Sequence, residues 1–160
     1  MKINDFLLRM WKDYSDLNPH INKVLDLIKE KESKTIINDH IALRTFNHKK
    51  INRHVLSSYF VKNGYKPIED LTFTEKKLKA TYYLHLDETL PRIFISELLL
   101  ENFSEKLQKS INNKIDEIDV ESISNPEFLT SGIPWSPIDY KTYKEIQSES
   151  DYASWVLAMG

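Results

Sequence analysis

Segment 38–46 holds the side chains of this sequence that are best suited to chemistry. It reads NDHIALRTF, and its β-branched and aromatic residues favour a strand. Because side chains alternate along a strand, His40 and Arg44 would share one face, with the small Ala42 between them. Their Cα atoms would lie about 13 Å apart at the usual rise per residue, and an arginine side chain can lean over much of that distance.

These two residue types suggest a site for a metal and an acid. A neutral imidazole is a common ligand of iron or zinc. A guanidinium can hold a carboxylate through two parallel hydrogen bonds. The segment therefore predicts that His40 binds a metal ion and that Arg44 anchors an acidic substrate. The alternative from the residues alone is a solvated polar face on which both side chains have ordinary surface roles.

Three further residues are candidates for supporting roles at such a site. Glu97 lies in an apolar run, where a carboxylate needs a partner, so we expect a structural or supporting role, with metal ligation as the alternative. His85 alternates with apolar residues on a predicted strand and would either line the site or make hydrogen bonds at the surface. Trp135 lies in a proline-rich loop and would either pack in the core or form part of a lid over a pocket.

The composition excludes several classes of function. The chain has 160 residues, a net charge of −2 and only short basic clusters, so neither nucleic acid nor an anionic membrane is expected as a partner. It has no cysteine, so a metal must be held by His and carboxylate. The N-terminal residues do not resemble a signal peptide, and no apolar run approaches the roughly 20 residues of a membrane span. We therefore expect a cytoplasmic protein.

The elements that would position these residues follow from hydrophobic spacing. Apolar residues at helical spacing predict helices over 3–16 and 19–31. The next part predicts, in order, a strand, a helix that Gly64 ends, and three strands, with the approximate ranges 36–46, 55–63, 65–70, 79–86 and 92–99. The last part predicts helices over 103–111, 140–147 and 151–159, with a loop at 131–137.

This order defines an α+β fold in one domain, 1–160. Residues 1–33 form its helical start, 36–99 a βαβββ unit, and 100–160 a segment of helices and loops. The βαβββ order resembles the repeat of the glyoxalase-like, vicinal-oxygen-chelate architecture. In that architecture two such units pair to form a cupped sheet that holds a metal, so residues 36–99 would supply half of a cup.

Four segments, in order, resemble the 2-oxoadipate dioxygenase/decarboxylase family. They are NDHIALRTF at 38–46, PRIFISEL at 91–98, SGIPW at 131–135 and SDYASWVLA at 150–158. The resemblance covers essentially the whole chain. It implies an Fe(II) ion held by two His and one Glu, with a small 2-oxo acid as the substrate that loses carbon dioxide and yields a hydroxy acid. By position in the motif, His40 would be the first metal ligand and Arg44 would bind the substrate carboxylate.

The sequence differs from the family pattern because part of the metal site is missing from it. The second His, the Glu and a second βαβββ unit would follow residue 160, so we expect the N-terminal portion of such an enzyme, which alone binds little Fe(II) and is inactive. Whether the chain acts as an enzyme stays open at this point. One alternative is a non-catalytic protein that binds a small acid or another chain. The other is a metal site that a second subunit completes, in a homodimer.

Overall fold

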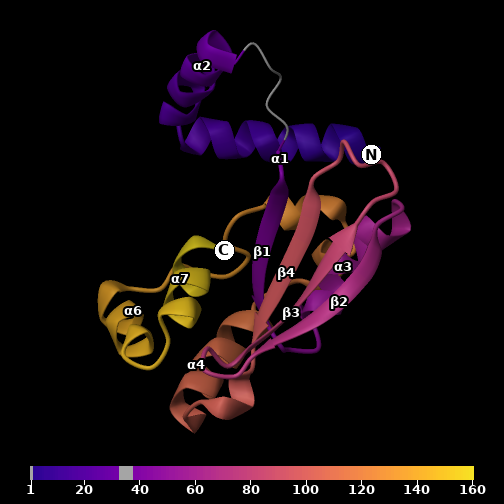
Figure 1. Ribbon diagram of the computed structural model, residues 1–160. Helices are drawn as coiled ribbons and strands as arrows, with labels where there is room; N and C mark the ends of the chain where they lie inside the picture. The colour runs from indigo at the N-terminus through magenta and orange to yellow at the C-terminus, as the bar shows by residue number, and fades with distance from the viewer. Residues whose placement is uncertain (1, 33–37) are drawn as a thin grey trace.

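The computed structural model of the chain describes residues 2–32 and 38–160 (Figure 1). The helices, in chain order, are α1 (Ile3–Leu17), α2 (His20–Glu32), α3 (Arg53–Lys62), α4 (Glu105–Asp116), α5 (Val120–Ile123), α6 (Tyr140–Gln147) and α7 (Asp151–Met159), with 3-10 turns η1 (Leu100–Asn102) and η2 (Pro126–Thr130). The strands are β1 (His40–Phe46), β2 (Lys66–Phe73), β3 (Leu78–Leu84) and β4 (Arg92–Leu98). The predicted α+β class and the βαβββ order are confirmed.

Side-chain caps explain where several of the helices begin. Asn52 begins α3 because its side chain accepts from the backbone N–H groups of His54 and Val55. Asp139 and Ser150 cap α6 and α7 in the same way. Gly64 follows α3 with a φ of +98°, a conformation that costs little only for glycine, and it turns the chain into β2.

The four strands form one sheet in the order β1-β4-β3-β2. β1 runs parallel to β4, and the other two pairs are antiparallel. β1 is therefore an edge strand, and Figure 1 shows α7 beside it. The predicted first strand began at residue 36, but residues 36 and 37 lie outside the described part of the chain. β2 extends three residues beyond its predicted end at Asp70, because its hairpin pairing with β3 continues to Phe73.

The two faces of the sheet differ in how they are covered. On the covered face, Ile93 and Ile95 of β4 pack with Phe6 of α1 and Phe60 of α3. The opposite face, which we call the open face, carries His40, Ala42 and Arg44 of β1, Arg92, Phe94 and Ser96 of β4, and Ala80 and Tyr82 of β3, by strand register. Its end near Phe46 and Leu98 is buried in a second core with α4, α6 and α7, and the adjacent Ala80 and Ser96 are buried as well.

None of the helices within the described ranges is long and apolar enough to cross a membrane.

Candidate functional site

The open face brings together the two residues that carry the predicted chemistry. His40 and Arg44 are exposed, whereas Ile41 and Leu43 between them are partly buried on the other side of β1. In the parallel register with β4, His40 lies opposite Arg92 and Arg44 lies opposite Ser96. The face near β1 thus carries two cationic side chains and an imidazole, with Ala42 leaving space between His40 and Arg44.

Arg44 has a free hydrogen-bonding edge. Its Cζ atom lies 4.6 Å from the centroid of the Trp155 ring, in a cation–π stack. No residue in the described part of the chain accepts a hydrogen bond from this guanidinium or forms an ion pair with it. Guanidinium groups commonly stack with their flat side on an aromatic ring, and their donors then lie in the plane, free for a carboxylate. Arg44 also borders a cavity of about 160 Å³ between β1, α7 and loop 131–137.

His40 has a carboxylate neighbour. Its Nδ1 atom lies 2.9 Å from Oδ2 of Asp39. The hydrogen bond with His40, followed by the charge of Arg92, lowers the pKa of the Asp39 carboxyl, so the carboxylate remains charged. A carboxylate on one ring nitrogen orients an imidazole and leaves the other nitrogen for a metal, as is typical of metal-binding histidines. His40 therefore fits one position of a metal site.

The rest of a metal site is not found among residues 2–32 and 38–160. No three His, Asp or Glu side chains in these ranges converge on a point where an ion could bind. His40 borders a hollow of about 470 Å³ between β1 and α1, and Ala42 and Leu43 line both this hollow and the cavity at Arg44. A ligand that contacts both His40 and Arg44 would pass over Ala42.

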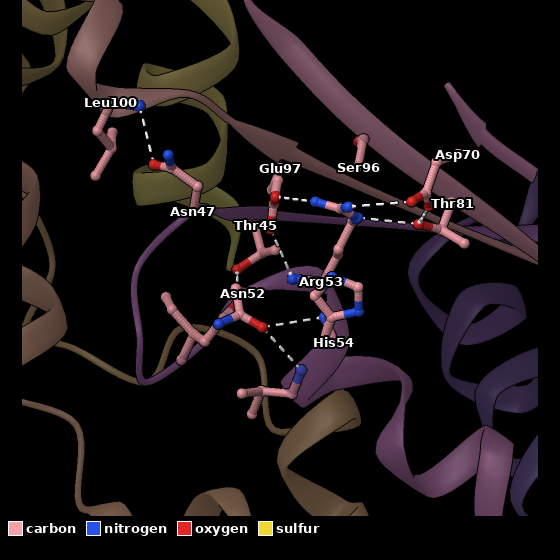
Figure 2. Close-up of polar contacts among 12 residues, drawn as sticks. Thr45, Asn47, Asn52, Arg53, His54, Asp70, Thr81, Ser96, Glu97 and Leu100 are labelled. Atoms are coloured by element: carbon pink, nitrogen blue, oxygen red, sulfur yellow. Dashed lines mark hydrogen bonds and ion pairs between the residues drawn. The ribbon is translucent and has the colours of Figure 1, made fainter. Parts of the chain in front are cut away.

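Glu97 lies on the covered face, opposite to the face that carries His40, and Figure 2 shows its side chain directed toward Arg53. Glu97 is only 4% exposed, and its carboxylate forms an ion pair with the Arg53 guanidinium. The backbone N–H of Arg53 also donates to this carboxylate, at 2.9 Å. Arg53 Nε also donates to Oγ1 of Thr81 at 2.9 Å, and Asp70 lies 3.5 Å from the guanidinium. These contacts satisfy the buried carboxylate, so in this structure Glu97 joins α3 to the sheet.

His85 lies in the turn after β3, apart from the open-face site. Its Nδ1 accepts from the backbone N–H of Asp87 at 2.9 Å, and its ring packs 5.2 Å from that of Tyr65. The ring also fills the space beside Gly64, where an added Cβ would lie 2.7 Å from its Nε2 atom. These contacts favour the hydrogen-bonding role of His85 over a place in the lining of the site.

Trp135 is buried and forms one wall of the cavity at Arg44. Its ring lies 6.5 Å from that of Phe46 in the second core. Its Nε1–H donates to the backbone oxygen of Leu157 at 3.0 Å, which ties loop 131–137 to the end of α7. The indole is thus a packed residue that also contacts the candidate site.

Two residues of α7, Tyr152 and Trp155, were not singled out from the sequence. The Tyr152 hydroxyl donates to the backbone oxygen of Ser96 at 2.9 Å and accepts from the backbone N–H of Thr45 at 3.1 Å. It lies 3.0 Å from Oγ of Ser96. Burial raises the pKa of Tyr152 to about 12, so the hydroxyl keeps its proton. Segment 150–158, noted for its motif, was the available signal for both residues.

Solved structures show the class of fold to which this arrangement belongs. A protein of Shewanella frigidimarina NCIMB 400, provisionally described as a hydrolase, superposes with a TM-score of 0.92 at 42% identity, over 99% of this chain and 61% of that one. Hydroxyglutarate synthase of Oryza sativa, solved in complex with 2-oxoadipate, superposes with a TM-score of 0.89 at 32% identity, over 98% of this chain and 54% of that one. This α+β fold is thus part of larger proteins.

The family follows from sequence comparison. The sequence profile of the 2-oxoadipate dioxygenase/decarboxylase family matches residues 6–160, and the chain belongs to this family. The 2-oxoadipate dioxygenase/decarboxylase of Oryza sativa subsp. japonica, described as chloroplastic/amyloplastic, is 32% identical over 94% of this chain and 44% of its own length. The chain thus spans less than half the length of that curated relative.

Proposed function

We propose that this chain supplies the acid-binding part of a dioxygenase/decarboxylase that acts on a 2-oxo acid similar to 2-oxoadipate. The unpaired, ring-stacked guanidinium of Arg44 on the open face is the observation that carries the proposal. Buried or structural arginines have their donors occupied, as Arg53 does. A guanidinium held in place with free donors is suited to a carboxylate.

His40 would supply one ligand of an Fe(II) ion that binds the other end of the substrate. Such an ion, when bound, supplies coordination of the 2-oxo acid and activation of dioxygen. The imidazole is oriented for this role by Asp39, and Ala42 leaves room for the carbon chain of the acid. Arg44 would fix the remote carboxylate and so determine the position of the reacting end.

The remaining metal ligands would come from outside the described residues. One neutral nitrogen leaves most of the coordination sphere to water, so we propose that the 160-residue chain alone binds Fe(II) weakly and does not turn over 2-oxoadipate. An anaerobic Fe(II) titration measures metal binding, and a separate assay in the presence of dioxygen and 2-oxoadipate measures carbon dioxide release. One tightly bound Fe(II) per chain with turnover that His40→Ala abolishes would contradict it, and would favour a site that a second copy completes.

The acid-binding role is tested by titrating 2-oxoadipate into the ¹⁵N-labelled chain and following the backbone signals of β1. Arg44→Met should raise the Kd at least ten-fold, because a charge-assisted pair contributes roughly 1.5–3 kcal/mol. Arg9→Met is the matched control, since Arg9 is an exposed arginine of α1 whose guanidinium already pairs with Glu127. An equal loss of affinity for 2-oxoadipate in Arg44→Met and Arg9→Met would indicate only a general charge effect, and Arg44 would then not be the acid-binding residue.

A further inference from the structure

We propose that Trp155 is the positioning residue of Arg44, and that Tyr152 places Trp155 for this role. The indole would hold the guanidinium plane while its N–H groups remain free for a carboxylate. This inference rests on the proposed function of Arg44 as the acid anchor. It assigns to α7 control over how well the site is organised before substrate binds.

The contact between Arg44 and Trp155 is compatible with substrate binding. The Cζ atom lies over the ring at 4.6 Å from its centroid, within the range of cation–π attraction. Stacking occupies the face of the guanidinium, whereas a carboxylate binds its edge, so both interactions can exist together. A long exposed side chain otherwise samples many rotamers, and binding must then order it. The contact with the indole restricts the Arg44 rotamers before substrate binds, so less conformational entropy is lost on binding.

Trp155 lies in this place because Tyr152 holds α7 against the two strands at the level of Arg44. Tyr152 precedes Trp155 by three residues, so the two side chains leave the same side of the helix. Its hydroxyl binds the backbone of Thr45, the neighbour of Arg44, and of Ser96, the residue opposite Arg44 in register. The hydroxyl thus joins β1, β4 and α7 at one point.

A second contact fixes the other end of the helix. The Trp135 indole N–H donates to the backbone oxygen of Leu157, two residues after Trp155. α7 is therefore held on both sides of Trp155 by hydrogen bonds to different parts of the fold. Trp155 itself is 42% exposed, although tryptophan usually buries more of its surface. Its ring is thus held at the surface, beside the Arg44 guanidinium.

The test uses two readouts on the 160-residue chain: the NMR signal of the Arg44 Nε–H group and the Kd for 2-oxoadipate. The indole ring current should shift the Arg44 signal upfield in the wild-type chain. Trp155→Leu should remove that shift and raise the Kd about two- to five-fold, the size expected for a cation–π contact at an exposed site. Trp155→Phe, which keeps an aromatic face, should retain part of the shift and stay within about two-fold of the wild-type Kd.

Two further variants separate positioning from folding. Tyr152→Phe keeps the ring but removes the hydroxyl, and should reduce the upfield shift of Arg44 while the signals of β2 and β3 remain unchanged. Tyr140→Leu removes another exposed aromatic residue, on α6, and should change neither readout.

The outcomes distinguish this inference from the proposed function. If 2-oxoadipate binding requires Arg44 but Trp155→Leu leaves both the Arg44 signal and the Kd unchanged, the positioning role is wrong and the acid-binding role remains. If 2-oxoadipate does not bind the wild-type chain, or binds equally to Arg44→Met, the proposed function fails and the positioning role fails with it.

Discussion

Two arginines of this chain show how the surroundings of one residue type separate a structural role from a binding role. The Arg53 side chain is 11% exposed, and its guanidinium contacts Glu97, Thr81 and Asp70. The guanidinium of Arg44 contacts the ring of Trp155, and no residue in the described part of the chain accepts a hydrogen bond from it. From the sequence, Glu97 was a candidate for a supporting role at the site and Arg53 was not considered. The pairing of the two accounts for the carboxylate inside an apolar strand.

We predict that Arg53→Met destabilises the chain by about 3–5 kcal/mol, because the Glu97 carboxylate would stay buried without its partner. Urea unfolding measures the change in the free energy of unfolding. Arg9→Met removes an ion pair whose side chains are 44% and 59% exposed, and should cost less than about 1 kcal/mol. The double variant with Glu97→Met should recover most of the loss. A small effect of Arg53→Met alone would mean that Glu97 reaches water.

The pKa of Tyr152 predicts a loss of stability at high pH. Burial raises this pKa to about 12 from 10.0, so the folded chain binds the proton more tightly than the unfolded chain does. The resulting stabilisation is complete below pH 10 and is lost as the pH rises from 10 to about 12. Burial also raises the pKa of Tyr65 to about 12 and raises that of Tyr59, so these tyrosines contribute to the same loss.

Tyr152→Phe should therefore reduce the fall in Tm between pH 9.5 and 11.5, whereas Tyr140→Phe, at a position that is 78% exposed, should leave it unchanged. At neutral pH, Tyr152→Phe should cost about 1–2 kcal/mol for the lost hydrogen bonds. An unchanged pH dependence in Tyr152→Phe would show that the hydroxyl is not protected from ionisation by the fold.

At the scale of the elements, local signals predicted most of the fold. The predicted bounds of α6 and α7 match the structure, because each helix has a capping residue in front of it and a short apolar stripe within it. The βαβββ order was also recovered, since period-two alternation and the stop at Gly64 are local as well. The short α5, η1 and η2 were missed, because pieces of three to five residues carry too little periodicity.

Contacts between distant segments were the part that the sequence could not supply. Spacing places His40 and Arg44 on one face but says nothing of Trp155, since the hydrogen bond from Thr45 to Tyr152 joins residues 107 positions apart. The candidate site was therefore predicted on β1 and missed on α7.

The turn between β2 and β3 is a local feature that the sequence also did not indicate. Lys77 has a φ of +54° there, a conformation in which glycine or asparagine is more usual.

Loop 131–137 is held by Glu117, which follows α4, and this tether should weaken in acid. Glu117 accepts from the backbone N–H of Ser136 at 2.6 Å and from Nζ of Lys114 at 2.9 Å. The bond from Ser136, followed by that from Lys114, lowers its pKa to about 2 from 4.5. A lowered pKa stabilises the folded chain above pH 4.5, and this contribution is lost as the pH falls from 4.5 to 2.

Glu117→Gln should therefore flatten the decrease in Tm between pH 5 and pH 2.5, and Glu121→Gln, on α5, should not. The loop carries Pro134 and Trp135, which line the cavity at Arg44, so its backbone NMR signals should shift over the same pH window. Loop signals that stay constant down to pH 2.5 in the wild-type chain would contradict the tether.

At the scale of the whole molecule, the two faces of the sheet are covered unequally, because the second core covers one end of the open face. α1 and α3 pack on the covered face, whereas Tyr82 and Phe94 on the open face are half-buried and Phe73 of β2 is 38% exposed. β1 is also an edge strand with no second neighbour in the described part of the chain. An edge of this kind can pair with another chain, and an uncovered apolar face favours association. We therefore predict that the 160-residue chain self-associates.

The strand pairing indicates how to block this association without unfolding the sheet. The backbone bonds Arg92 N–H to Asp39 O and Asn47 N–H to Leu98 O show that odd-numbered residues of segment 39–47 point their backbone groups toward β4. Residues 40, 42 and 44 therefore point theirs toward the free edge. Ala42→Pro removes a donor from that edge and leaves the β1–β4 ladder intact, as proline is tolerated on edge strands.

Ala42→Pro should raise the dissociation constant for self-association about ten-fold or more, the equivalent of one or two backbone hydrogen bonds. Light scattering and sedimentation measure this constant, and Tm checks the fold. Leu43→Pro is the contrasting variant, because it removes a donor that faces β4 and should lower Tm sharply. If the wild-type chain stays monomeric at high concentration, neither the open face nor the β1 edge mediates self-association. If it associates and Ala42→Pro has no effect, the contact lies on the apolar face and not along the strand edge.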